Sequence, residues 1–126
     1  MFITCGEALY DMFVKPSVGG TPHGVTVDGV VGGSPLNMAL GLARMGNRVS
    51  LFTRISNDAF GQRLRDFMAN NQISDEYCIA VDQPTTLAMV ETDETGHPSY
   101  SIYSNGTADC SMEMSDVPGE LDPRDG

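Results

Sequence analysis

The chain has 126 residues, 40% of them hydrophobic, which suits one domain with a modest core. Its 17 acidic and 7 basic residues give a formal net charge of −10 at pH 7, so nucleic acid and anionic membrane surfaces are poor partners. The sequence contains neither an apolar run long enough to cross a membrane nor the basic start of a secretory signal. Three cysteines without a CxxC pair argue against a disulfide framework and a zinc site, and we expect a cytoplasmic protein.

The first part of the chain predicts strands separated by a loop. Residues 2–5 have the composition of a short buried strand, and Gly6 to Asp11 are expected to continue it toward the surface. Two prolines and three glycines within residues 15–24 indicate a loop, and the alternation in residues 25–31 predicts a half-buried strand. Asp11 at the far end of the first strand can accept hydrogen bonds from two adjacent sugar hydroxyls, although a solvated loop aspartate would have the same sequence context.

A helix is predicted directly after the second strand. Ser34 is expected to be its N-cap residue, with Pro35 at the first helical position. Gly46 stands where a left-handed C-terminal cap is expected. The apolar residues of one buried face follow the helical spacing: Leu36, Ala39, Leu40 and Ala43.

The start of this helix has the features of a binding site. Gly32 and Gly33 would let a ligand approach the backbone, and the free amides and positive dipole end of the helix attract oxygen-rich groups. Asn37 in the first turn can both donate to and accept from a hydroxyl. The stretch therefore predicts that a polyol or sugar binds at this turn.

The remaining residues predict a parallel α/β unit followed by a hairpin. Residues 49–55 resemble another strand, and Ser56 to Asp58 offer caps for a second helix with apolar residues at Phe60, Leu64, Phe67 and Met68. A strand is expected at 77–81, and strands at 85–92 and 99–104 form a β-hairpin around an acidic turn. A helix is expected to start within 105–110, and Val117 and Leu121 are the core candidates of the final segment.

Four stretches together resemble the ribokinase-like sugar kinases, also called the phosphofructokinase-B family, and the fructokinases most of all within it. They are GEALYDMF, GGSPLNMALGLARMG, SNDAFG and YSNGTAD, and Ser56 departs from the glycine usual at its position. The resemblance implies that residues 1–126 are the N-terminal part of a ribokinase-like three-layer α/β fold. It also implies a small β-sheet lid with strands near residues 12–31 and 85–104.

The resemblance implies specific roles for individual residues. Asp11, Gly33 and Asn37 would bind sugar hydroxyls, and Gly32 would shape the turn. The lid would close over the substrate and pair with a second subunit, giving a homodimer. Its residues over the substrate would be Ala88, Val90, Ile102 and Tyr103.

The implied activity is ATP-dependent phosphorylation of a sugar hydroxyl, with a ketohexose such as fructose as the acceptor. Relatives that act on acidic keto-sugars, and many fructokinases, carry an arginine where this chain has Ser104, which favours a sugar without a carboxylate but also departs from those fructokinases. The GAGD-type catalytic motif and the adenine pocket of the family do not occur in these residues. We therefore expect ATP and Mg²⁺ to act in the full enzyme through an absent C-terminal part, and no catalytic residue, metal site or bound cofactor in this chain alone.

Other functions stay open at this point. A nucleoside kinase or a 2-keto-3-deoxygluconate kinase is the nearest alternative among kinases, and a non-catalytic sugar-binding module is another. A dinucleotide-binding oxidoreductase also has a strand, a glycine turn and a helix. However, GGSPLN is not GxGxxG, and the next strand, LFTRIS, has no acidic residue at its end.

Overall fold

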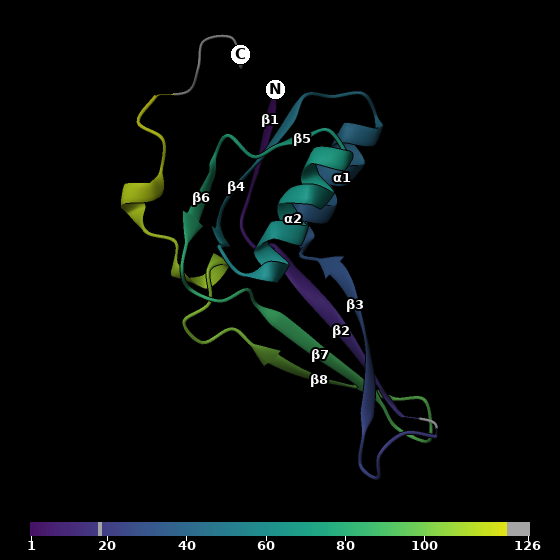
Figure 1. Cartoon of the computed structure of the whole chain (residues 1–126). Helices are drawn as coiled ribbons and strands as arrows, with labels where there is room; N and C mark the ends of the chain where they lie inside the picture. The colour runs from purple at the N-terminus through teal and green to yellow at the C-terminus, as the bar shows by residue number, and fades with distance from the viewer. Residues whose placement is uncertain (18, 121–126) are drawn as a thin grey trace.

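The computed structural model describes residues 1–17 and 19–120 and divides them into an α/β body and a smaller sheet, the lid sheet, which extends from it (Figure 1). The strands are β1 (Phe2–Cys5), β2 (Leu9–Pro16), β3 (Val25–Gly32), β4 (Val49–Ser56), β5 (Ile73–Ser74), β6 (Cys78–Val81), β7 (Leu87–Thr92) and β8 (Pro98–Tyr103). The helices are α1 (Ser34–Arg44) and α2 (Ala59–Asn70), followed by the short 3₁₀ helices η1 (Asp109–Ser111) and η2 (Met114–Asp116).

The body is a parallel sheet built around β4. Strand β1 pairs with one edge of β4, while β5 and β6 pair with it on the other side. The predicted strands at 49–55 and 77–81 are confirmed, whereas β5 was not predicted because it has only two residues. The largest fully buried apolar side chains come from β4 and the two helices: Leu36, Leu51, Ile55, Leu64 and Met68.

Helix α1 follows the prediction except at its first residue. Gly33 is the N-cap residue, with φ 104°, and Ser34 is already helical and makes no capping hydrogen bond with its side chain. The predicted serine cap is wrong because the chain enters the helix through a conformation that only glycine adopts readily. The predicted left-handed Gly46 is confirmed at φ 84°. Leu36, Ala39 and Ala43 are buried, and Leu40 at the edge of that face is half-buried.

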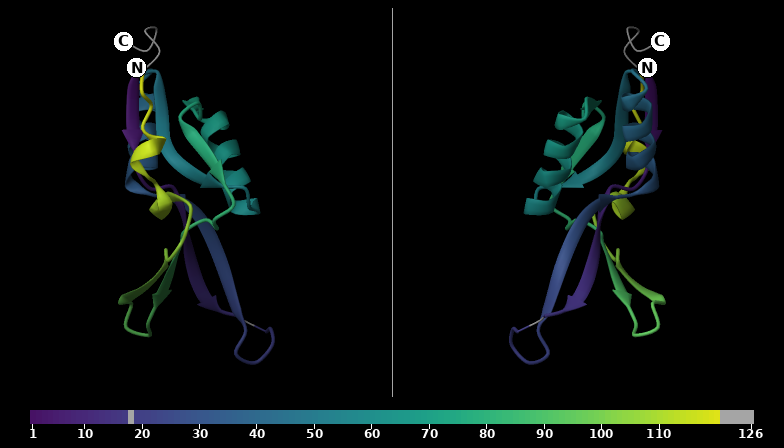
Figure 2. Two further views of the ribbon diagram at one scale, coloured as in Figure 1. Left: turned by 90° about the vertical axis from the view of Figure 1, so that its left-hand side faces the viewer. Right: turned by 90° about the vertical axis from the view of Figure 1, so that its right-hand side faces the viewer.

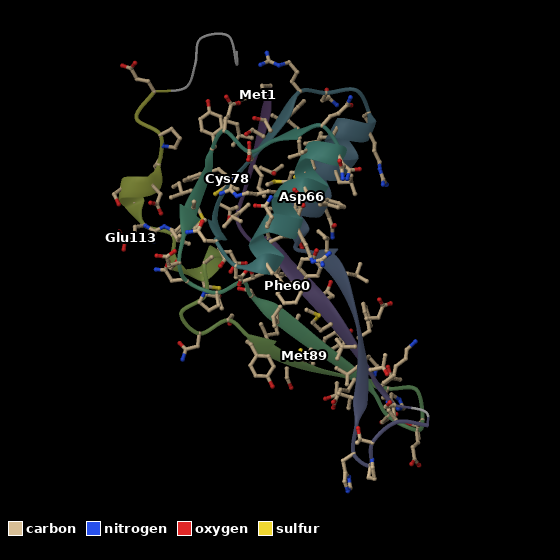
Figure 3. All side chains as sticks on the ribbon, viewed as in Figure 1. Met1, Phe60, Asp66, Cys78, Met89 and Glu113 are labelled. Atoms are coloured by element: carbon tan, nitrogen blue, oxygen red, sulfur yellow. The ribbon has the colours of Figure 1, made fainter. Side chains whose placement is uncertain are left out.

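Helix α2 begins at the predicted capping segment. The Asp58 carboxylate accepts a hydrogen bond from the Gly61 amide at 2.7 Å. The Asp58 amide donates to Ser56 Oγ at 3.0 Å, so the serine that departs from the family pattern takes part in the turn. On the side of α2 nearest the lid sheet, the Phe60 ring lies 5.0 Å from the Tyr10 ring of β2, which joins body and lid sheet (Figure 3).

The lid sheet has the strand order β3-β2-β7-β8, with β2 and β7 parallel and the two outer pairs antiparallel (Figure 2). The expected continuation of the first strand from Gly6 to Asp11 is wrong. Strand β1 ends before Gly6, whose φ is 134°, and β2 starts at Leu9 in the other sheet. Asp11 therefore lies inside a central lid strand, and the predicted loop at 15–24 starts only after Pro16.

Two further expectations on exposure and helix content differ from the structure. Strand β3 was expected to be half-buried, but it is the edge strand of the lid sheet and its first six residues are exposed. The helix expected within 105–110 is the single 3₁₀ turn η1. Val117 is 51% exposed rather than a core residue, and Leu121 lies outside the described residues.

The segment with η1 and η2 is fastened to β4 by an ion pair. Arg54 donates to both carboxylate oxygens of Asp116, with N–O distances of 2.7 and 2.9 Å. Hydrogen bonding to Arg54 holds the pKa of Asp116 below its ordinary value. The segment lies against the body on the side away from the two helices (Figures 1 and 2).

Candidate functional site

The register of the lid sheet brings Asp11 beside two of the predicted lid residues. Asp11 of β2 is paired with Ala88 of β7, and Ala88 is paired with Ile102 of β8. Because directly paired residues of neighbouring strands point to the same face, these three side chains form one row across the sheet. Val90 is on the same face, two residues further along β7.

A cavity of about 500 Å³ lies between this face of the lid sheet and the start of α1. It includes five of the predicted site residues: Asp11, Gly33, Asn37, Ala88 and Ile102. The structure thus brings together residues that are up to 91 positions apart in the chain, from Asp11 to Ile102. The other three predicted residues do not line this cavity: Gly32, Val90 and Tyr103.

The two glycines before α1 lie too close to neighbouring atoms to carry a side chain. A Cβ on Gly32 would lie 2.4 Å from Oδ2 of Asp11, so the missing side chain makes room for that carboxylate. A Cβ on Gly33 would lie 2.6 Å from the Glu7 carbonyl oxygen, at a φ of 104° that side chains disfavour. The glycine pair therefore sets both the position of Asp11 and the path into the helix.

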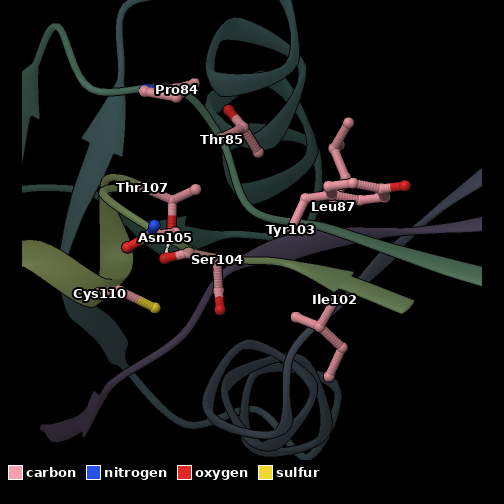
Figure 4. A pocket seen from close by; sticks show the side chains of 9 residues that line it. All are labelled: Pro84, Thr85, Leu87, Ile102, Tyr103, Ser104, Asn105, Thr107 and Cys110. Atoms are coloured by element: carbon pink, nitrogen blue, oxygen red, sulfur yellow. Dashed lines mark hydrogen bonds between the residues drawn. The ribbon is translucent and has the colours of Figure 1, made fainter. Parts of the chain in front are cut away.

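Tyr103 lies on the opposite face of the lid sheet. It is paired with Leu87, one residue away from the Ala88–Ile102 pair, and successive side chains of a strand alternate between faces. Figure 4 shows Tyr103 beside Leu87, with Ile102 pointing away from them. Tyr103 lines a second cavity of about 720 Å³, whose lining shares Ile102, Ser104 and Cys110 with the first cavity.

The first cavity is acidic. Glu7, Asp11 and Asp109 line it, and none of its described lining residues is a lysine, arginine or histidine. Glu7 lies at the start of α1, with Oε1 3.5 Å from the Ser34 amide nitrogen. Within residues 1–17 and 19–120, no three His, Cys, Asp or Glu side chains come together to hold a metal ion. The cavity thus offers separate hydrogen-bond acceptors, a chemistry that suits a ligand rich in hydroxyl groups.

Sequence reasoning missed several residues that line the cavity. Tyr100 follows from the alternation of β8, because it lies two residues before Ile102. Thr86 was predicted within a strand and Asp109 ends the quoted stretch YSNGTAD, but neither pattern indicated a place in the cavity. Their position depends on contacts between segments that are distant in the chain.

These two residues belong to a polar cluster at the base of the lid sheet. The Thr86 hydroxyl contacts Oδ1 of Asp109 and lies 2.6 Å from the Thr107 hydroxyl, which donates to the Ser104 carbonyl at 2.9 Å. Thr86 and Thr107 are 2% and 4% exposed. Oδ2 of Asp109 is closed to solvent and has no hydrogen-bond partner within the described part of the chain.

A second carboxylate, that of Asp58, holds Thr85, the residue directly before Thr86. Asp58 accepts hydrogen bonds from the Thr85 amide at 2.9 Å and the Thr85 hydroxyl at 2.7 Å. Burial raises the pKa of Asp58, but the hydrogen bonds from Thr85, Gly61 and Ser56 outweigh it and hold the pKa below its ordinary value. The entry to β7 is therefore fixed from both α2 and the segment after β8.

Comparison with known proteins finds one family over almost the whole chain. The model of the pfkB family carbohydrate kinases matches residues 2–122. A fructokinase of Rhizobium leguminosarum bv. trifolii is 30% identical over 122 residues, which are 94% of this chain and 35% of that protein. A 5-dehydro-2-deoxygluconokinase of Geobacillus thermodenitrificans is 29% identical over 118 residues, which are 92% of this chain and 35% of that protein.

Solved structures agree with this match. A crystal structure of fructokinase with bound ATP from Xylella fastidiosa has a TM-score of 0.83 and 27% identity, covering 93% of this chain and 37% of that one. The chain thus spans little more than a third of the length of these relatives. No helix among the described residues is long and apolar enough to span a membrane.

Proposed function

Because this chain belongs to the pfkB family of carbohydrate kinases, we propose that it binds the acceptor sugar for ATP-dependent phosphorylation and that this sugar is a neutral ketohexose such as fructose. The observation that carries the proposal is the cavity that Asp11, Gly33 and Asn37 form with the lid sheet. A carboxylate, a helix N-terminus and an amide side chain there offer both acceptors and donors to neighbouring hydroxyl groups.

The charge of the cavity supports an uncharged sugar. The relatives include both fructokinases and 5-dehydro-2-deoxygluconokinases, whose names indicate a neutral and an acidic sugar. Three carboxylates and no basic side chain among the described lining residues would repel a substrate carboxylate. Ser104 in this lining stands where relatives that use acidic keto-sugars, and many fructokinases, carry arginine, so it argues against a substrate carboxylate and does not by itself favour fructose.

The described residues account for sugar binding and not for phosphoryl transfer. Transfer requires stabilisation of the phosphate charge and a group that positions the attacking hydroxyl. We propose that residues outside this chain supply these groups and bind ATP. The part played by the lid is to exclude water from the sugar once it covers the cavity.

We also propose that the lid sheet pairs with a second copy of the chain. Exposed apolar side chains are concentrated on it, including Phe13, Val30, Tyr100 and Ile102 on the face that carries Asp11. Exposed apolar surface of this kind is typical of protein–protein contacts. Pairing through this face would bury the apolar rim around the sugar cavity.

Substitution of Asp11 tests the proposed sugar site. We expect Asp11→Ala to weaken fructose binding by ~1 to 3 kcal/mol, or about 5- to 150-fold, because charge-assisted hydrogen bonds to hydroxyls are lost. Isothermal titration calorimetry measures the affinity. Asp28→Ala is the matched control, since Asp28 is an exposed acid of the same sheet that does not line the cavity.

A panel of ligands separates the alternatives. The proposal predicts binding of fructose and much weaker binding of adenosine and of 2-keto-3-deoxygluconate. Preference for adenosine would favour a nucleoside kinase, and preference for the acid would contradict the charge argument. Equal fructose affinity in Asp11→Ala and the unmodified chain would remove Asp11 from the site.

A further inference from the structure

We propose that Tyr100 of the lid sheet is a specificity-determining residue, whose aromatic ring packs against a C–H face of the bound sugar ring. The proposal rests on the sugar-binding function proposed above and adds a residue to that site. Tyr100 lies in β8, two residues before Ile102, and its side chain lines the same cavity as Asp11 and Asn37. This contact would recognise that the ligand is cyclic, which hydrogen bonds to its hydroxyl groups alone do not.

The strand register places Tyr100 on the face of the lid sheet that carries Asp11. Tyr100 is paired with Val90 of β7, and Val90 is paired with Phe13 of β2, two residues beyond Asp11. Paired residues point to the same face, as do residues two apart in one strand. Among Tyr100, Val90 and Phe13, Tyr100 alone lines the cavity. It therefore marks the end of the cavity that is nearest the tip of the lid sheet.

The cavity has a polar wall and an apolar wall. On the side of β2 and α1, Asp11 and Asn37 offer a carboxylate and an amide. Within β7 and β8, the lining side chains are those of Ala88, Tyr100 and Ile102. A sugar ring is amphipathic in the same way, because its hydroxyl groups surround a ring whose faces expose C–H groups. The two walls thus match the edge and one face of a single ring, as in small-molecule pockets that combine apolar surface with a few polar groups.

The Tyr100 side chain is accessible to a ligand in the empty cavity. It is 66% exposed, whereas its neighbour on this face, Ala88, is 7% exposed and offers only a methyl group. Covering the ring with a sugar removes apolar surface from water, which favours binding. The face of an aromatic ring also carries partial negative charge, which attracts the weakly positive hydrogens of C–H groups. Tyr100 is therefore the lining residue best suited to contact a ring face.

A contact of this kind selects for a closed ring. D-Mannitol is an open-chain polyol that fructose yields on reduction, so it has hydroxyl groups but no ring face. 2,5-Anhydro-D-mannitol, in contrast, holds a five-membered ring closed. Hydrogen bonds from either ligand to Asp11 are equally available, whereas the contact with Tyr100 adds affinity only for the cyclic one. Specificity is a difference between two affinities, and Tyr100 acts on this difference.

The test compares cyclic and open-chain ligands in the 126-residue chain and two variants of it. Calorimetric titration with D-fructose, 2,5-anhydro-D-mannitol and D-mannitol gives the affinities, with competition against fructose for the weakest ligand. We expect Tyr100→Ala to bind the two cyclic ligands about 3- to 10-fold more weakly, the usual effect of a lost aromatic contact, and to bind mannitol unchanged. Tyr100→Phe keeps the ring and should keep all three affinities.

A fluorescent side chain reports the contact directly, because the chain contains no tryptophan. Tyr100→Trp places a single tryptophan in the cavity lining, and we expect its emission to shift to shorter wavelength as fructose covers the ring. Ser101→Trp is the matched control. Ser101 is the next residue of β8, is paired with Met89 on the opposite face, and does not line the cavity. The emission of this control should not respond to fructose.

The outcomes separate the role of Tyr100 from the sugar site itself. If the unmodified chain binds fructose and Tyr100→Ala loses no affinity, or loses it equally for cyclic and open-chain ligands, the role of Tyr100 is refuted and the sugar site stands. An equal loss is the result expected if the substitution only weakened the pairing of lid sheets or the fold. The role is also refuted if Tyr100→Phe loses as much affinity as Tyr100→Ala, or if the emission of Tyr100→Trp does not respond to saturating fructose. If the unmodified chain binds no ligand of the panel, both proposals fall.

Discussion

Single carboxylates at the base of the lid sheet each serve more than one element. Asp58 caps α2 through the Gly61 amide and fixes the entry to β7 through Thr85. Asp109 fixes the same entry through the Thr86 hydroxyl, and its second oxygen, Oδ2, is closed to solvent. Two consecutive threonines are therefore held by two acids, one at the start of α2 and one in the segment after β8.

The Asp58 cap should make stability depend on pH. The pKa of this carboxyl is lower in the folded chain than in the unfolded chain, so its stabilising effect is complete at neutral pH and is lost as the pH falls through the folded-state pKa. We expect Asp58→Ala to lower the free energy of unfolding at pH 7 by ~0.5 to 2 kcal/mol, the usual value of an N-cap. Urea denaturation at pH 7 and at pH 3 measures the difference from the unmodified chain.

The difference in free energy of unfolding between Asp58→Ala and the unmodified chain should be smaller at pH 3 than at pH 7. Asp66→Ala, at an exposed position of the same helix, is the control, and its effect should stay within about 0.5 kcal/mol. If Asp58→Ala lowers the free energy of unfolding equally at pH 7 and pH 3, the cap acts through packing alone.

At the scale of elements, the two helices differ in whether a glycine position has room for a side chain. Gly61 lies in the first turn of α2, and a Cβ there would lie 1.8 Å from the Ser56 carbonyl oxygen. Gly41 lies on the exposed side of α1, where a Cβ would have no neighbour within 4 Å. The first glycine permits close packing of helix and strand, whereas the second has no described packing role.

Alanine at these two positions should have opposite effects. Gly61→Ala should destabilise the chain by ~1 to 3 kcal/mol or more, because backbone atoms must shift. Gly41→Ala should stabilise it by ~0.5 to 1 kcal/mol through helix propensity. Thermal and urea unfolding measure both changes. If Gly61→Ala leaves the free energy of unfolding unchanged, α2 can move away from Ser56 at no cost.

Local patterns predicted the elements whose contacts are local. The strand, helix and strand from residue 25 to 56 and the hairpin of β7 and β8 were predicted because periodicity, caps and turn residues are all present in the sequence. The break at Gly6 and the exposure of β3 were not, because both depend on which sheet a strand joins. The same limit applied to the site: the place of Asn37 in the first turn of α1 was predicted from local features, whereas the positions of Asp11 within the lid sheet and of Asp109 depend on tertiary contacts.

At the scale of the whole molecule, the body is packed on both sides of β4 and the lid sheet is not. The helices cover one face of the body sheet, and the segment held by Arg54 and Asp116 lies on the other. The lid sheet instead has exposed apolar residues on both faces, such as Val30 on one and Val25 on the other, which are 47% and 60% exposed. Exposed apolar surface of this kind is typical of protein–protein contacts, which agrees with the pairing proposed above.

The proposed pairing through the Asp11 face predicts a difference between these two valines. Val30→Asp would place a charge in the buried part of the contact and should weaken self-association at least about 10-fold, because an unpaired charge is costly to bury. Val25→Asp introduces the same charge on the opposite face of the same strand and should leave association nearly unchanged. Sedimentation velocity over a range of concentrations measures both. If Val25→Asp dissociates the pair and Val30→Asp does not, the copies meet through the other face, and the sugar cavity lies outside the contact.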